Sequence, residues 1–197
     1  MGNMENSGVE LELGYNNRIG DVTFKVSGNI SYLKNKVTFL GSDKTFLPGQ
    51  TFGPQGVEMT RTVLGNAIGS FFGFKTNGLF QNRDEVLNYK NKDGGLLQPD
   101  AQPGDIRFVD YNNDGKINND DRHIIGDPTP NISYGFTAEA AWKGFDILVF
   151  GQGVAGNDVF QALRRFDLPT ANWTTEALSR WTGEGTSISS PALYTMM

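Results

Sequence analysis

Four runs of alternating apolar and polar residues set the strongest limit on how this chain can fold. The runs are Val9–Tyr15, Val22–Tyr32, Ile132–Trp142 and Phe145–Gly153. A period of two places the apolar side chains on one face of an extended strand and the polar ones on the other. Only Lys143 and Gly144 separate the last two runs, as in a tight antiparallel hairpin. The pattern therefore predicts an all-β chain with antiparallel strands.

The lengths of the connections suggest an up-and-down arrangement. We expect strands at about residues 9–18, 22–37, 57–64, 69–80, 132–143 and 145–156. Short turns at 17–21, 65–69 and 143–144 alternate with long excursions at 38–56, 81–131 and from 157 onward. In an up-and-down sheet, this alternation puts the short turns at one end and the long loops at the other. Residues 171–181 are the only helix candidate, with Asn172 or Thr174 as the cap and Glu176 in the first turn.

Two architectures fit these strands. Short turns at one end and long loops at the other are typical of outer-membrane β-barrels. The polar positions suit a wet lumen and would be costly against lipid: they are Thr23, Lys25, Ser27, Asn29, Thr137, Glu139 and Lys143. Aromatic residues that could form an interfacial girdle stand near strand ends: they are Tyr15, Tyr32, Trp142 and Phe145. A soluble β-sandwich with one solvated face gives the same alternation, so the strand pattern leaves both open.

Composition excludes several classes of protein. A net charge of −5 and a pI near 4.9 argue against a nucleic-acid partner, because no basic stripe is available for phosphates. The chain has no cysteine, which excludes disulfides and thiol chemistry. No apolar run approaches the roughly 20 residues of a transmembrane helix, and the first ten residues do not form a secretory signal. If the protein crosses a membrane, it does so with strands.

A twelve-residue acidic loop, residues 110–121, has the spacing of a calcium-binding loop. The glycine that allows the sharp turn is Gly115, at position six. Oxygen donors occupy positions one, three, five, seven (through the backbone carbonyl), nine and twelve: they are Asp110, Asn112, Asp114, Lys116, Asn118 and Asp121. Aspartate replaces the usual glutamate at position twelve, which weakens the case for bidentate contact. The alternative is that Asn-Asp-Gly forms only a β-turn in a solvated loop.

The surroundings of this loop favour a structural role for a metal. Residues 106–109 look extended, and Pro128 and Pro130 follow, so no pair of helices flanks the loop. We therefore expect structural calcium rather than a calcium switch.

No catalytic site is predicted, so we expect the chain not to be an enzyme. His123 is the only histidine, and its charged neighbours fit a loop residue better than a member of a triad. The glycines of residues 151–157 do not lead from a strand into a helix, so they do not form a phosphate cradle. Trp173, Trp181 and Tyr111 could stack on sugars or on a partner, or could pack locally.

Several stretches resemble the SusC/RagA family of TonB-linked outer-membrane transporters. They are GDIRFVDYNNDGKINNDDRHIIGDPTPNISYGF, KGFDILVFGQGVAGND, LSRWTGEGTS, GNMENSGVELEL and GNAIGSFFGFKTNGLFQ. The resemblance covers nearly the whole chain, residues 1–197. It implies part of the C-terminal region of a large transmembrane β-barrel with long extracellular loops. Since plugged barrels of this type have about 22 strands, about six strands imply a fragment, with the plug domain absent.

The resemblance also implies a function and partners. The parent would be a TonB-dependent receptor in the cell outer membrane, embedded in lipid, that imports oligosaccharides or other glycan-derived nutrients. Its loops would face a SusD-like surface lipoprotein, and the TonB complex would act on the plug. The alternative is a soluble calcium-stabilised β module for carbohydrate binding or adhesion.

Overall fold

A computed structural model describes residues 2–53, 56–161 and 172–192, which divide into two compact units. The first unit is built from residues 1–50, 60–71 and 126–160, and the second from 51–59, 72–125 and 161–197. The fold is nearly all β, with antiparallel sheets, as the alternating runs predict. Among the described residues, no helix has both the length and the apolar content needed to cross a membrane.

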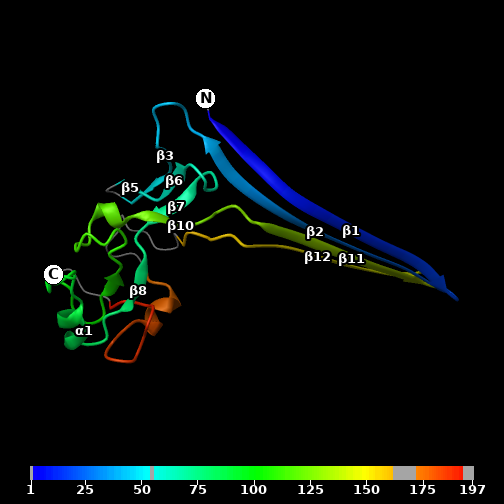
Figure 1. Ribbon diagram of the computed structural model, residues 1–197. Helices are drawn as coiled ribbons and strands as arrows, with labels where there is room; N and C mark the ends of the chain where they lie inside the picture. Colours follow the sequence, from blue (N-terminus) through cyan, green and yellow to red (C-terminus); the bar gives the residue numbers. More distant parts are fainter. Residues whose placement is uncertain (1, 54–55, 162–171, 193–197) are drawn as a thin grey trace. The chain divides into compact units, whose positions relative to one another are not determined.

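The first unit is dominated by a four-stranded antiparallel sheet. Its order is β1-β2-β11-β12, and Figure 1 shows these four long strands side by side. The strands are β1 (Asn3–Ile19), β2 (Val22–Phe39), β11 (Ile132–Trp142) and β12 (Phe145–Ala155). The pairing of β2 with β11 joins two hairpins that are nearly a hundred residues apart in sequence into one surface.

The two hairpin turns lie at the same end of this sheet. Val22 pairs with both Ile19 and Trp142, and Trp142 pairs with Phe145. Lys143 and Gly144 have φ values of 46° and 88°, the left-handed pair that a two-residue hairpin with the right-handed strand twist requires. Lys143 therefore lies in the turn and not on the polar face, where the sequence placed it. Its Nζ lies 3.4 Å from a carboxylate oxygen of Asp21 in the other turn.

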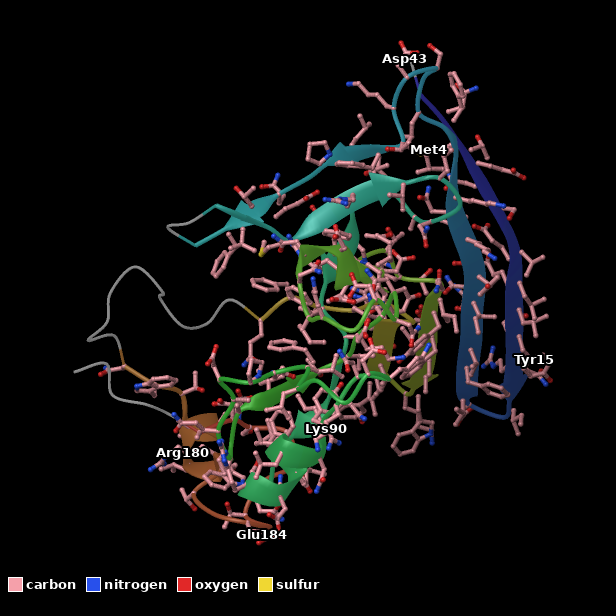
Figure 2. All side chains as sticks on the ribbon, turned by 60° about the vertical axis from the view of Figure 1, so that its left-hand side comes forward. Met4, Tyr15, Asp43, Lys90, Arg180 and Glu184 are labelled. Atoms are coloured by element: carbon pink, nitrogen blue, oxygen red, sulfur yellow. The ribbon has the colours of Figure 1, made fainter. Side chains whose placement is uncertain are left out.

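One face of the sheet is apolar across all four strands. Cross-strand rows on this face include Leu11–Ile30–Tyr134–Gly153, Tyr15–Val26–Ala138–Val149 and Ile19–Val22–Trp142–Phe145. Its large side chains are exposed in the described part of the chain, with Leu13 at 67% and Phe145 at 72%. Figure 2 shows Met4 and Tyr15 toward opposite ends of the β1–β2 hairpin. A face this long and this apolar needs a non-aqueous cover.

Aromatic rings fill the places on this face where β12 has no side chain. A Cβ atom added at Gly151 would collide with the ring of Phe136, and one added at Gly153 would lie 2.5 Å from Oη of Tyr134. The rings of β11 thus cover the glycines of β12, which keeps the apolar surface continuous.

The strands expected at 57–64 and 69–80 are present, but each range is divided into two short strands. These strands lie outside the long sheet: β5 (Val57–Glu58), β6 (Thr60–Val63), β7 (Ser70–Gly73) and β8 (Thr76–Leu79). The antiparallel pairing between the two ranges is limited to β6 and β7. In the first unit, β6 pairs with β3 (Phe46–Pro48) and with the start of β7. β5 pairs with β4 (Thr51–Phe52). The run of three phenylalanines at residues 71, 72 and 74 lacks a strict period of two, so it defines no lipid-facing side.

The turn at 65–69 also lies at the opposite end of β2 from the two hairpin turns, which corrects the expected placement. The Gly65 N–H donates to the Val37 carbonyl, and the Val37 N–H donates to the Asn66 carbonyl, both at 2.9 Å. Val37 is only 3% exposed. Val37, near the loop end of β2, is therefore packed by protein, whereas the apolar side chains of Val26 and Ile30 in the middle of the strand are exposed.

The second unit holds the long excursion around a small core of Phe80, Val86 and Ala101, with Tyr89 packed against it. β8 pairs with β9 (Ile106–Phe108), and β10 (His123–Gly126) lies beside the end of β7. A short helix, α1 (Arg83–Asn88), was not predicted. Its signal was present: Asn82 caps the Glu85 N–H at 3.0 Å, with acidic residues in the first turn.

The helix expected at 171–181 is not an α-helix where the structure describes it. Residue 171 lies outside the described residues, and Thr175–Ser179 form a 3-10 helix, η2. Thr174 is its cap position, without a side-chain hydrogen bond. The chain end at 194–197 also lies outside the described residues.

Candidate functional site

The acidic loop is closed by hydrogen bonds from its own backbone. The Asp110 carboxylate accepts the N–H groups of Asp114 at 3.2 Å and Gly115 at 2.9 Å. Asn112 Oδ1 accepts the Asp114 N–H at 2.8 Å, and its Nδ2 donates to Asp114 Oδ2 at 3.1 Å. Asp114 Oδ1 in turn accepts the Lys116 N–H at 2.9 Å. The side chains at positions one, three and five therefore gather on the inside of one tight turn, where Gly115 has φ = 85°.

Asp121 is a fully buried carboxylate that ties the two ends of the loop together. It accepts N–H groups from Tyr111 at 2.8 Å, Asn112 at 3.4 Å and Asn118 at 2.8 Å. Together with Asn118 it forms a capping box at η1 (Asn119–Asp121). Burial alone would raise the pKa of Asp121, but the three N–H donors outweigh burial and hold the pKa below its ordinary value. Asp121 is therefore ionised throughout the physiological range.

These contacts test the fit of the loop to a calcium ion. The side chains of Asp110, Asn112 and Asp114 lie together and keep unused oxygen lone pairs, as a hard cation requires. Asp121 already accepts three N–H groups, and Asn118 Oδ1 accepts the Asp120 N–H at 2.7 Å. Across the described residues, no group of three or more acidic or histidine side chains is arranged to hold a metal. The side chains of Asp110, Asn112 and Asp114 therefore fit a calcium ion better than those of Asn118 and Asp121, at positions nine and twelve.

A neighbouring turn, which the sequence analysis missed, holds the loop from outside. Asn91 Nδ2 donates to the Gly115 carbonyl at 3.0 Å, and Asn91 Oδ1 accepts the N–H groups of Asp93 and Gly95 at 3.0 and 2.8 Å. A Cβ atom at Gly115 would lie 3.0 Å from Asn91 Nδ2, so glycine also allows this close approach. The signal was the run Asn91–Gly95, which is a turn sequence. A hollow of about 330 Å³ lies between this turn and the acidic loop.

Aromatic side chains near the loop serve mainly to pack it. The rings of Tyr111 and His123 stack with centroids 3.5 Å apart, and His123 Nδ1 lies 3.0 Å from the Asp121 carbonyl. Tyr89 donates its hydroxyl to the Phe108 carbonyl at 2.6 Å. Burial raises the pKa of Tyr89, so this hydroxyl stays protonated and remains a donor. His123 thus has a structural place beside the loop.

The three aromatic residues expected on the loop surface differ in exposure. Tyr111 and Trp173 are 51% and 47% exposed. Trp181 instead packs over Gly104, where an added Cβ atom would lie 2.5 Å from its ring, and its indole N–H is buried with no hydrogen-bond partner among the described residues. Trp181 is therefore a packing residue, and only the other two present their rings at the surface.

Comparison with known proteins gives a consistent set of relatives. No protein-family model matches the chain. TonB-dependent receptor P3 of Formosa agariphila is 32% identical over 201 residues, covering 98% of this chain and 19% of the receptor. TonB-dependent receptor P26 of the same organism is 29% identical over 188 residues, covering 93% of this chain and 18% of the receptor. The chain thus spans about a fifth of the length of these curated relatives.

Solved structures show the same fold. A structure of the RagAB peptide transporter superposes with a TM-score of 0.65 at 20% identity, over 98% of this chain and 20% of that chain. The RagAB peptide importer in an open-open state gives a TM-score of 0.66 at 19% identity, with the same coverage. These similarities support the antiparallel barrel-type fold that the family resemblance implies, which the strand pattern alone left open beside a β-sandwich.

Proposed function

The chain corresponds to a segment of a SusC/RagA-type TonB-dependent receptor, and from this premise we propose that it forms part of the wall of an outer-membrane β-barrel that imports a nutrient. The observation that carries the proposal is the exposed apolar face shared by β1, β2, β11 and β12. Lipid is the cover that such a face requires, and the opposite face, with Lys25 and Glu139, faces water.

The strand lengths support this role. β11 and β12 have 11 residues each, and a tilted transmembrane strand needs about 9–11. The short turns mark one membrane surface, with Trp142 and Phe145 in the aromatic belt there. Tyr32 and Tyr134 occupy the same face near the start of β11, one membrane thickness away.

The substrate and the partner belong to the same proposal. We assign the parent receptor to uptake of oligosaccharides or other glycan-derived nutrients, with a SusD-like surface lipoprotein over the long loops. The RagAB neighbours are described as a peptide transporter and a peptide importer, so peptides are the second candidate substrate. Energy would reach the receptor from TonB through a plug domain.

The acidic loop has a structural part in this proposal. Calcium held mainly by Asp110, Asn112 and Asp114, with the Lys116 carbonyl, would neutralise the gathered oxygens and brace the excursion. The loop would otherwise depend on neutral amide donors, from the backbone and from Asn112 Nδ2, which do not neutralise its negative charge.

One experiment separates the barrel from a soluble calcium-stabilised β module. The parent protein is expressed in its own host, and membranes and periplasm are separated without detergent. We expect the receptor in the outer membrane, because a soluble module could not leave this apolar face exposed. Recovery from the soluble periplasm would overturn the barrel. Loss of oligosaccharide uptake on deletion of the receptor gene then tests transport.

A further inference from the structure

A hollow of about 500 Å³ opens across β2, β11 and β12, on the face of the long sheet that carries Lys25 and Glu139. Its centre is Gly135, which pairs with Asn29 on one side and Gln152 on the other. Since glycine has no side chain, space remains over Gly135 between the two amides, whose Cα atoms are two strand spacings, roughly 10 Å, apart. The Asn29 amide leans into this space, because a Cβ atom added at Gly135 would lie 3.1 Å from Asn29 Oδ1. Phe150 and Ser133 close the hollow along the strand direction.

The polar groups around the gap are neutral and available. In the part of the chain that the structure describes, neither the Asn29 nor the Gln152 amide makes a side-chain hydrogen bond. The hydroxyls of Ser133 and Ser31 lie 2.6 Å apart and share one hydrogen, so the pair keeps a second donor for a ligand. Phe150 and Val154, which are 59% and 58% exposed, lie on the same face as these polar groups. An aromatic ring among amides and a hydroxyl is the composition of a site for a polar molecule that also has an apolar face.

The hollow lies near the loop end of the wall, and that end is held in place by the protein. Asn131 Nδ2 donates to the Gly156 carbonyl at 3.1 Å, and the Leu33 N–H donates to the Asn131 carbonyl at 2.8 Å. Two hydrogen bonds join Asp158 to Asp127. The Asp158 N–H donates to the Asp127 carbonyl at 2.7 Å, and the Asp158 carboxylate accepts the Asp127 N–H at 2.9 Å. The groups around the hollow are therefore preorganised on rigid strands.

From this geometry we infer that the hollow is a contact site for one ring of a neutral oligosaccharide on the barrel wall. The inference rests on the proposed function and names a substrate class for it. Asn29, Ser133 and Gln152 bond the sugar hydroxyls, and Phe150 covers the C–H face of the ring. Gly135 is the floor that gives the ring its room.

The surroundings argue against two other ligand classes. Extended peptides are typically bound along an unpaired strand edge. The hollow is centred on β11, which is paired on both sides, and in the proposed closed barrel the outer edge of β12 is paired as well. Glu10 and Glu12 on β1 pair with Ser31 and Asn29 and lie on the same face beside the hollow, so they repel an anionic sugar chain.

The test uses the full-length parent receptor, purified in detergent, with binding measured by calorimetry. The probes are neutral hexasaccharides of glucose, xylose, galactose and mannose, a hexasaccharide of uronic acids, and a neutral hexapeptide. We expect a neutral hexasaccharide to bind, and Asn29→Ala and Gln152→Ala each to weaken it about three- to tenfold, the effect of one lost hydrogen bond. Gly135→Leu, which fills the gap, should abolish binding. Thr23→Ala, on the same face near the turn, is the matched control and should change nothing.

Three results overturn the inference. One is unchanged affinity in Asn29→Ala, Gln152→Ala and Gly135→Leu, with each variant shown to be folded by its detergent-resistant, heat-modifiable mobility. Another is tighter binding of the uronic hexasaccharide or of the peptide. The third is no binding of any neutral hexasaccharide by the folded wild type. If gene deletion abolishes uptake while the variants bind normally, the proposed transport stands and this site does not.

Discussion

A single arginine placed on the apolar face tests the orientation of the wall. On β2 the aromatic belts lie near Val22 and Tyr32, so Val26 stands close to the middle of the membrane-facing stretch. Its row neighbours are Tyr15 and Ala138, and its side chain is 47% exposed. Arginine at the membrane midplane costs about 2–4 kcal/mol on a barrel surface. Val26→Arg should therefore lower the folding equilibrium roughly 30- to 900-fold.

Matched variants separate lipid exposure from general damage. Ser27→Arg lies one residue away on the polar face, so its charge enters the water-filled side and should cost little. Tyr32→Arg lies on the same face as Val26 but in the belt, where the cost should fall to about 0–1 kcal/mol. The assay is guanidinium unfolding of the full receptor refolded into phospholipid vesicles. Equal costs at Val26 and Ser27, or a larger cost at Tyr32 than at Val26, would refute the assigned lipid face.

Three further predictions concern the acidic loop. Calorimetry of the parent receptor with Ca²⁺ should show one site with a Kd of roughly 10⁻⁴ to 10⁻³ M, and Asp114→Ala should remove it; a wild type without calcium-dependent heat or thermal shift contradicts the metal. Because the pKa of Asp121 lies below its ordinary value of 3.8, its contribution to stability is complete above that value and is lost as the pH falls through the lower folded pKa. Asp121→Asn should therefore destabilise the receptor at neutral pH and flatten the acid limb of its stability profile; an unchanged limb would show that Asp121 is not the titrating group. Replacing residues 110–121 by a short Gly-Ser link should leave the barrel in the outer membrane but weaken co-purification of the SusD-like lipoprotein and slow glycan uptake; normal pull-down and uptake would limit the loop to local stability.

The long sheet could be predicted from sequence because its environment is simple. The strands β2 and β11 each have one apolar and one polar face, so the period of two in Val22–Tyr32 and Ile132–Trp142 indicates directly which residues share a face. The Lys143–Gly144 turn is equally local, since a two-residue hairpin needs two left-handed residues. The pairing of β2 with β11 was not predictable from the patterns. About a hundred residues separate the two strands, and alternation with a period of two does not indicate which strand pairs with which.

The excursions could not be predicted in the same way, because their order comes from specific hydrogen bonds. The spacing of Asp110, Asn112 and Asp114 correctly indicated a tight turn. It did not show that the Asp121 carboxylate would accept hydrogen bonds from three backbone N–H groups. Asn91, which anchors the loop, carries no periodic signal. Similarly, residues 69–80 have strand-forming composition but bury Ser70 and Leu79 locally instead of continuing the wall.

The edges of the long sheet add a final constraint. In the described residues, β1 and β12 are the outer strands, each with a neighbour on one side only. Inside a membrane an unpaired edge leaves backbone N–H and carbonyl groups without water or protein partners, at several kcal/mol each. A closed barrel with further strands on both sides would satisfy these edges, and it would also suit the exposed apolar face. We therefore expect the two hairpins to be stable as part of a barrel wall and not as an independent domain, because their exposed apolar face and open edges need lipid and neighbouring strands.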